Sequence, residues 1–295
     1  MMYSLINQGL KIRWFNTAGF EMIIPGGAHI LVDPWLDSAT IYPFPLEQVE
    51  RADYILLSHV HFDHAQDIEK ILAKFPKAKL LMGDLSIEAL CREQHVSLTN
   101  IYRVRNGDEY QFDDVNIKIY GGRHTENAKG AYLPEKWDAD RQSLDSETGW
   151  FGSLELQQYL ITANDGTSVL IWGGQTTADQ KYRLQNLHPD LAILHVSPKQ
   201  DPDVFGEMVK FIGPKVVIPH HYDMTKPLFE ERPELLQIML SDEQRAKYTV
   251  DGKFDDAAFV SAFGAALKKW CPTASMLRIS HHKWYSFGLA CEESD

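Results

Sequence analysis

The sequence has little cysteine, with three in 295 residues at Cys91, Cys271 and Cys291. An odd number of widely separated thiols does not make a disulfide framework, so the fold must depend on a hydrophobic core. Hydrophobic residues make up 44% of the chain, an ordinary share for a globular protein with a sizeable core. We therefore expect reduced, mostly buried thiols in a cytoplasmic protein.

Long apolar runs and positive charge are also scarce. No run approaches the roughly 20 apolar residues that cross a bilayer, and Met1–Leu10 lacks the basic and apolar regions of a secretory signal. Lys and Arg number 29 against 41 Asp and Glu, a formal net charge of −12. Because a nucleic-acid backbone requires a basic face, we expect a small-molecule substrate, with no nucleic-acid partner and no membrane insertion. Oligomerisation stays possible.

One short stretch is rich in metal-ligand side chains. Three histidines and an aspartate lie within the run HVHFDH, directly after the apolar run YILL, which predicts a buried strand. Side chains two residues apart on an extended backbone point the same way, so His59 and His61 can bind one ion while Asp63 and His64 reach to the other side of the turn. A polar turn with exposed histidines is the alternative. The density of imidazole and carboxylate groups favours a metal site.

The spacing from His59 to His64 resembles the H-x-H-x-D-H signature of the metallo-β-lactamase superfamily, and the resemblance covers about residues 11–225. It implies an α/β fold, a four-layer αββα sandwich with a metal cleft at one edge. Two ions roughly 3.5–4 Å apart are typical of such hydrolases. The resemblance implies one ion on His59, His61 and His124, and a second on Asp63, His64 and His221.

Several of these residues have a second interpretation. A lone histidine after a strand is more often structural than a ligand, but the first ion needs a third ligand, and His124 follows a predicted strand. The family's P-x-H pattern selects His221 over His220. Asp33 matches an aspartate that orients metal-binding histidines, although an Asp-Pro pair also forms turns.

Substrate contacts are less well defined. His195 ends a predicted strand and is a secondary candidate for the cleft, and Arg123 is either an anion contact or a surface charge. The long segment 127–150 contains Trp137 and Trp150, which either cover a substrate or pin the loop.

The periodicity predicts a single domain over 1–295, with sandwich halves of about 1–126 and 151–295 joined by that loop. We expect strands at 11–15, 20–24, 29–32, 54–57, 79–82, 108–112, 115–120, 157–163, 168–172, 191–195 and 215–218. Helices are predicted from 65 to 75 and at 85–91, 178–187, 204–212 and 255–270. Residues 276–287 are expected as one edge strand, with His281 and His282 on the surface.

One position departs from the family pattern. Where a strand of the second half should end in an aspartate that bridges both metals, the sequence has Gln175. An amide is neutral and offers one good acceptor oxygen, and two divalent ions close together repel each other strongly. We therefore expect the second ion to bind weakly or not at all.

The resemblance implies a hydrolase with one or two zinc ions, manganese and iron being possible. Water activated by the metal would attack a carbonyl or phosphorus centre, and Asp63 would orient it or accept its proton. The motifs VDPW and PHHY are most similar to the L-ascorbate-6-phosphate lactonase branch, which implies a small lactone, ester or phosphoester as substrate. Three alternatives are a pseudoenzyme with one structural metal, a phosphodiesterase or nuclease, and a redox di-iron protein.

Overall fold

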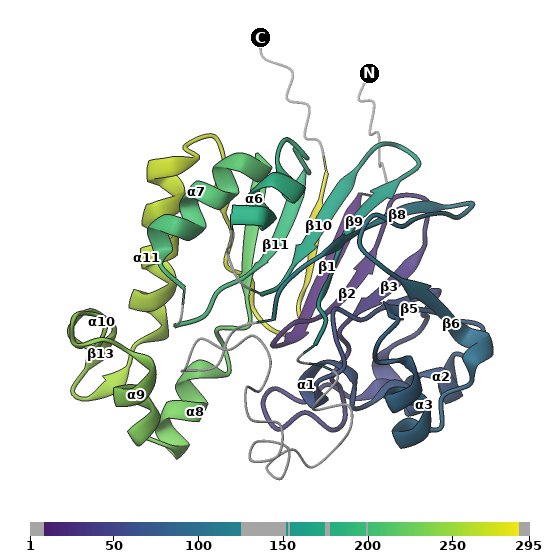
Figure 1. Cartoon of the computed structure of the whole chain (residues 1–295), viewed down its shortest axis with the longest axis horizontal. Helices are drawn as coiled ribbons and strands as arrows, with labels where there is room; N and C mark the ends of the chain where they lie inside the picture. Colours follow the sequence, from purple (N-terminus) through teal and green to yellow (C-terminus); the bar gives the residue numbers. More distant parts are fainter. Residues whose placement is uncertain (1–8, 125–151, 153, 175–177, 199, 289–295) are drawn as a thin grey trace, which may run out of the picture.

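The computed structural model describes residues 9–124, 152, 154–174, 178–198 and 200–288. Two seven-stranded sheets are its largest elements (Figure 1). The strands of the first sheet, in spatial order, are β16 (Trp284–Phe287), β1 (Leu10–Asn16), β2 (Gly19–Ile23), β3 (His29–Val32), β4 (Tyr54–Leu56), β5 (Lys79–Gly83) and β6 (Ile101–Val104).

In the second sheet, the spatial order of the strands is the reverse of their order along the chain. Its strands, in spatial order, are β15 (Ser275–Met276), β12 (Val216–His220), β11 (Leu191–His195), β10 (Ser168–Trp172), β9 (Gln157–Ala163), β8 (Val115–Gly121) and β7 (Glu109–Gln111). A separate small hairpin pairs β13 (Thr249–Val250) with β14 (Lys253–Phe254).

Helices cover the outer faces of the sheets and one edge of the sandwich. In Figure 1, α2 and α3 lie beside the first sheet, α6, α7 and α11 lie beside the second, and α1, α8 and α9 lie toward the lower edge. The described helices are α1 (Phe62–Ala65), α2 (Ile68–Lys74), α3 (Ile87–Gln94), α6 (Ala178–Leu184), α7 (Pro202–Ile212), α8 (Thr225–Glu231), α9 (Glu234–Met239), α10 (Asp242–Tyr248) and α11 (Asp256–Trp270). This arrangement confirms the four-layer αββα sandwich.

Both faces of the first sheet are buried, and its side chains alternate between two cores. Ile30 and Val32 of β3 belong to the core between the sheets, whereas Leu31 between them packs in the core under α2 and α3. This period of two follows from the pleat of an extended chain. It explains why the strands read as continuous apolar runs instead of alternating ones.

Strand direction brings several loops to one edge of the sandwich. Strands β3, β4 and β5 are parallel to one another, as are β10, β11 and β12. Strand β8 is antiparallel to β9, which is antiparallel to β10, so β8 also runs with the parallel set. Loops that follow such strands therefore leave their sheet at the same edge, where ligands bind in open α/β sheets.

The two sheets do not correspond to the two sequence halves that were predicted, about 1–126 and 151–295. Strands β7 and β8 precede residue 126 but pair with β9 of the second sheet, and β16 from the far end of the chain pairs with β1 of the first. Periodicity identifies strands but carries no information on which sheet they join, and the division at about 126 is therefore corrected. Strand β6 and helices α8, α9 and α10 were not expected from the sequence.

The expected edge strand over 276–287 is two short strands on different sheets, β15 and β16. Between them, His281 stacks between the rings of Trp14 and Tyr42, with centroid distances of 4.0 and 3.8 Å. His282 donates its backbone N–H to the carbonyl of Trp14. Both histidines are half-buried, so their prediction as surface residues is wrong. No helix among the described residues is long and apolar enough to cross a membrane.

Candidate metal centre

The run of ligands after β4 folds as a loop followed by one helical turn. His59 lies in the loop, His61 is the N-cap of α1 with extended backbone angles, and Asp63 and His64 lie in that turn. The extended backbone at 59–61 and the helical turn at 62–65 send the two pairs of side chains in different directions. A single loop thus supplies groups to two separate clusters.

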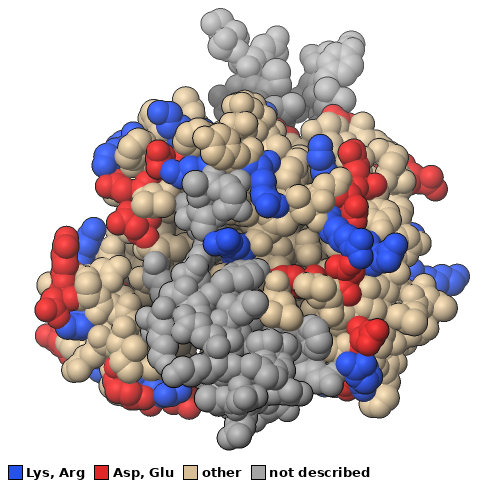
Figure 2. Space-filling view, in the orientation of Figure 1, with Lys and Arg blue, Asp and Glu red and all other residues tan. Residues whose placement is uncertain are grey.

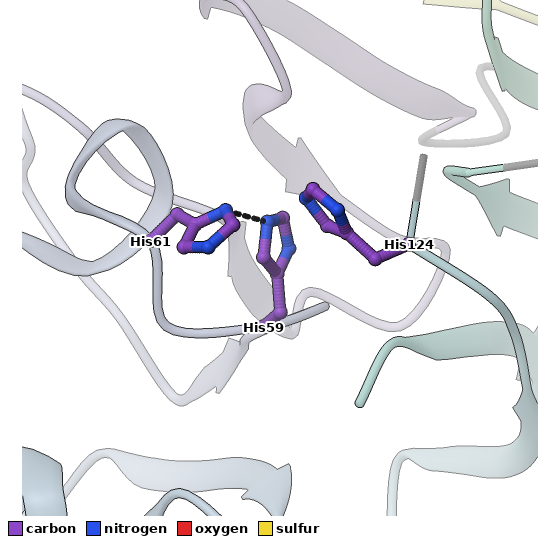
Figure 3. Close-up of side chains that lie close together, drawn as sticks. All are labelled: His59, His61 and His124. Atoms are coloured by element: carbon purple, nitrogen blue, oxygen red, sulfur yellow. Dashed lines mark hydrogen bonds between the residues drawn. The ribbon is translucent and has the colours of Figure 1, made fainter. Parts of the chain in front are cut away.

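The first cluster contains imidazoles alone. His59 and His61 come from the loop after β4, and His124 lies three residues beyond β8 of the other sheet. Figure 3 shows the three rings converging, with His59 Nε2 3.0 Å from His61 Nδ1. One ligand nitrogen from each of the three residues lies within 4.8 Å of the other two.

The second cluster contains a carboxylate and two imidazoles. Asp63 Oδ2 lies 3.5 Å from His64 Nε2 and 3.4 Å from Nε2 of His221, which follows β12. These ligand atoms also lie within 4.8 Å of one another. Asp63 and His64 are buried, and His221 is half-buried. This cluster, like the first, draws its groups from both sheets.

Asp33, which directly follows β3, links the two clusters through hydrogen bonds. Its Oδ1 accepts the backbone N–H of Ser58 at 2.7 Å, and its Oδ2 accepts the Ser58 hydroxyl at 2.6 Å and His64 Nδ1 at 2.9 Å. Ser58 Oγ also lies 3.0 Å from His59 Nδ1. Since the serine proton goes to the carboxylate, His59 Nδ1–H is the donor to Oγ. These contacts place a proton on Nδ1 of each ring and turn Nε2 of His59 and His64 toward the ligand atoms of the two clusters.

Burial and neighbouring charges set the protonation of the site. Burial lowers the pKa of His59 well below its ordinary value, and the surrounding imidazoles lower it further. For Asp63, burial raises the pKa, but His64 and His221 outweigh it and leave the carboxyl below its usual range. For His64, burial lowers the pKa, while Asp63 and Asp33 raise it, and the net direction is upward.

Left-handed backbone conformations gather around the site. Thr17, Asp33 and His221 have φ values of 34°, 41° and 68°, a region that costs non-glycine residues about 1–3 kcal/mol each. Hydrogen bonds join two of these positions, because His221 N–H donates to the Thr17 carbonyl at 3.0 Å. The Thr17 N–H donates in turn to Asp223 Oδ2 at 2.9 Å, and its hydroxyl donates to the Asp63 carbonyl at 3.3 Å. The turn after β1 thus fixes the loops that carry Asp63 and His221.

A cavity of about 280 Å³ opens onto both clusters. His195, at the end of β11, lines it and lies with its ring 4.8 Å from that of His221. Burial lowers the pKa of His195 well below its ordinary value, followed by the effect of His221. Arg123 is exposed and is not among the described residues that line the cavity. Gln175, Trp137 and Trp150 lie outside the described residues.

His220 and His221 lie in different surroundings. His220 is buried, with Nε2 3.2 Å from the Trp172 carbonyl and Nδ1 3.3 Å from the Thr17 carbonyl, so both nitrogens face backbone oxygens. Burial lowers its pKa to about 3, with a smaller contribution from His221. Only His221 joins the second cluster.

Sequence reasoning did not single out Ser58, Thr17 or Asp223. Ser58 directly precedes the ligand run, and its position at the strand end was the available signal. Thr17 and Asp223 carry no such signal, because their role depends on contacts across 206 positions of sequence separation. Gly174 has a φ of 110°, and a Cβ there would overlap the Arg123 carbonyl, so the close approach of the segment after β10 to the segment after β8 requires glycine.

The donor sets fit divalent transition metals. Zinc binds imidazole nitrogens at about 2.0–2.1 Å, which puts two nitrogens on one ion within about 4.2 Å of each other. Both clusters are close to this spacing, and His59 and His64 have Nδ1 contacts of the kind that orient metal ligands. Imidazoles with a carboxylate suit zinc, iron and manganese, so the donors alone do not select the metal.

Two facing mixed sheets, flanking helices and clustered ligands at one edge define the metallo-β-lactamase fold. The family model described as the β-lactamase superfamily domain matches residues 11–221. The chain belongs to this family. The match ends at the last residue of the second cluster.

Curated relatives agree with this assignment. The chain is 26% identical over 234 residues to a UPF0173 metal-dependent hydrolase of Koribacter versatilis, covering 78% of this chain and 91% of the relative. It is 28% identical over 236 residues to a UPF0173 metal-dependent hydrolase of Aeropyrum pernix, covering 76% and 86%.

Solved structures share the fold at low identity. Igni18, a metallo hydrolase from Ignicoccus hospitalis, superposes with a TM-score of 0.61 at 16% identity, covering 95% of this chain and 99% of that one. The metallo-β-lactamase fold protein YhfI of Bacillus subtilis gives 0.58 at 12% identity, covering 95% and 100%. These likenesses concern the fold alone.

Proposed function

We propose that this protein is a metal-dependent hydrolase of a small lactone, ester or phosphoester, with zinc as the first metal to test. The observation that carries the proposal is the pair of ligand clusters that share one loop and open onto one cavity. Family membership and the names of the relatives, metal-dependent hydrolases, support the reaction class. The assignment to the L-ascorbate-6-phosphate lactonase branch stays a prediction.

The proposed ligands divide as the clusters do. His59, His61 and His124 would hold one ion, and Asp63, His64 and His221 the other. Divalent ions in such sites act as Lewis acids and lower the pKa of the water they hold toward 7. Asp63 supplies the only carboxylate among the ligand atoms of the two clusters, so it is our candidate to orient water and accept its proton. Asp33 and Ser58 hold the imidazoles in the required tautomer.

The mixture of basic and acidic side chains on the surface favours a small-molecule substrate over a nucleic acid. Figure 2 shows basic and acidic side chains interspersed among the described residues of one face of the molecule. The formal net charge of −12 points the same way. We therefore expect no nucleic-acid partner. Retention on single-stranded or double-stranded nucleic acid that weakens with salt would instead favour the nuclease alternative.

The first experiment combines metal analysis with a substrate panel. Protein purified without chelator should contain at least one transition-metal ion per chain, and a chelator should remove both the metal and hydrolysis of lactones, esters or phosphodiesters. His59→Ala should lower the metal content because it removes one imidazole of the first cluster. An unchanged metal content in that variant, with normal folding, contradicts the proposed ligand set.

A pseudoenzyme is the second candidate, and Gln175 favours it. An amide at the expected bridging position removes one negative charge from a site meant for two cations. Gln175→Asp should raise the occupancy of the second ion at limiting metal concentration, measured by metal titration. If the wild-type protein holds one ion without hydrolysis, and the variant gains both a second ion and hydrolysis, the natural protein is a degraded enzyme.

A further inference from the structure

We propose that the cavity accepts a carboxylic ester or lactone that carries an apolar alkyl group, and that α8 and the end of α9 bind this group. The inference rests on the proposed function, because it names the substrate class for the same metal centre. It selects carbonyl substrates over phosphorylated sugars.

The large side chains of the cavity wall beyond the histidines and ligand clusters are apolar, and the smaller polar ones include Ser197 and Thr225. Among the described lining residues, the large side chains that are not ligands or histidines are Phe62, Leu156, Ile171, Met224, Leu228 and Met239. Methionine side chains adapt to irregular apolar surfaces and are common where a site binds flexible groups. A cavity lined by apolar side chains with a few convergent polar groups is typical of small-molecule sites.

Helix α8 and its N-cap contribute apolar side chains to this wall, close to the second cluster. Met224 and Leu228 are four residues apart, so they lie on the same side of the helix, only a few residues after His221. The next residue, Phe229, turns away and packs with its ring 5.2 Å from that of Phe254 in β14. The helix therefore has one apolar side anchored in the core and another left at the cavity.

Charge in the cavity argues against a phosphorylated substrate. None of the described residues that line it is a lysine or an arginine, and its carboxylates are Asp33 and Asp63. A sugar phosphate bound through its reacting carbonyl at the metals would place a remote phosphate and several hydroxyls against leucine and methionine. Burying such groups without hydrogen-bond partners is unfavourable, whereas an alkyl chain gains free energy there.

Phe62 extends the apolar surface to the mouth of the cavity. It is 59% exposed, although it is a large aromatic side chain on the same helical turn as Asp63 and His64. Its ring meets the edge of Trp35 at 5.5 Å, which holds it in place. An exposed, fixed aromatic residue beside a metal centre suits contact with an apolar ligand.

The test measures binding of a homologous series of carboxylates to the zinc-loaded protein by calorimetry. Acetate, butyrate, hexanoate and octanoate share one metal-binding head and differ only in chain length. The dissociation constant should fall about two- to fourfold for each added methylene that the wall covers. Glucose 6-phosphate should bind no more tightly than inorganic phosphate.

Two variants and a matched control locate the effect. Leu228→Ser and Met239→Gln should each reduce the ratio of the acetate and octanoate dissociation constants by about three- to tenfold. Met239→Gln keeps the side-chain length and is half-buried at the end of α9, so it serves if Leu228→Ser does not fold. Ile238→Ser changes a neighbouring residue of α9 that is 61% exposed and is not a lining residue, and should leave the ratio unchanged.

The outcomes separate this inference from the proposed function. Hydrolysis of short esters without any dependence of binding on chain length supports the hydrolase and overturns the apolar subsite. Binding that strengthens with chain length but no hydrolysis of any ester or lactone supports the subsite and overturns the hydrolase. No measurable binding of octanoate, or glucose 6-phosphate binding more tightly than inorganic phosphate, overturns the inference.

Discussion

The two ligand clusters share one loop but differ in charge. The first consists of three imidazoles, His59, His61 and His124, without an anion, whereas the second has the carboxylate of Asp63 between two imidazoles. The second cluster also has Asp33 against His64, whereas the first reaches Asp33 only through the Ser58 hydroxyl. The chain thus offers one neutral and one anionic site, joined by a buried hydrogen-bond network.

This difference predicts a different source of metal affinity for each cluster. In the neutral cluster it depends on the number of nitrogens and their spacing, so losing any one imidazole removes a third of the ligands. In the anionic cluster the carboxylate also offsets the charge of the ion. We propose that Gln175 takes the bridging position, where its neutral amide would add no such charge, so Asp63 would matter more for a second ion.

The largest expected effect on activity comes from removing one ligand from one cluster at a time. At saturating metal concentration, where a weak second site also fills, His61→Ala should lose the ion of the first cluster, and Asp63→Asn, which keeps the shape but removes the charge, should lose that of the second. Each should reduce kcat/KM by about 10³-fold, because Lewis acidity contributes several kcal/mol. Metal analysis and anomalous diffraction of both variants measure which ion remains. If both variants lose the same ion, the two clusters are one site.

A smaller effect should follow from breaking the network that joins the clusters. Asp33→Asn keeps the side-chain size but weakens the acceptor for Ser58 and His64, so metal affinity or activity should fall about 10–100-fold. Ser58→Ala should cost less and act mainly on the first cluster. Asp37→Asn is the control, because this exposed aspartate accepts the Leu46 N–H in a loop and does not line the cavity. Equal losses in all three variants would indicate general destabilisation.

The smallest expected effect concerns a carboxylate with a structural role, Asp190. Burial raises its pKa, but hydrogen bonds from Lys215 and Ser168 outweigh that effect and leave the pKa below its ordinary value. Folding therefore disfavours protonation, so the stabilisation is present above the ordinary aspartate pKa and is lost as the pH falls through the lower folded pKa.

Asp190→Asn should accordingly lower the free energy of unfolding by about 0.5–1 kcal/mol at pH 7. Urea unfolding at several pH values measures this difference, which should shrink between pH 5 and pH 3. Metal content should stay at the wild-type level, in contrast to the variants at Asp33 and Asp63. Asp251→Asn, at an exposed turn, is the control. A difference that is independent of pH would show that Asp190 acts through packing and not through its charge.

Most strands of the core were predictable from local pattern. The bounds of β3, β9, β10 and β11 match the predicted ranges, because each is an apolar run bounded by turn residues. Strand β6 was missed because it holds one fully buried residue, Val104, in four. The helices over 225–248 were missed because they are short and follow the last motif of the chain. Sheet membership of β7, β8 and β16 depends on pairing between distant segments.

The sequence by itself determined the local cluster from His59 to His64, because four ligand groups on one turn are close whatever the rest of the chain does. It also marked His124, His195 and His221 as residues at or just beyond strand ends. The family resemblance implied that His124 joins the imidazoles and His221 joins Asp63, but the residues alone did not, since parallel strands in two sheets must end at one edge for these loops to meet. Only the tertiary structure decided the contact between Thr17 and Asp223, because a hydrogen bond between segments 206 residues apart depends on packing and leaves no pattern in the sequence.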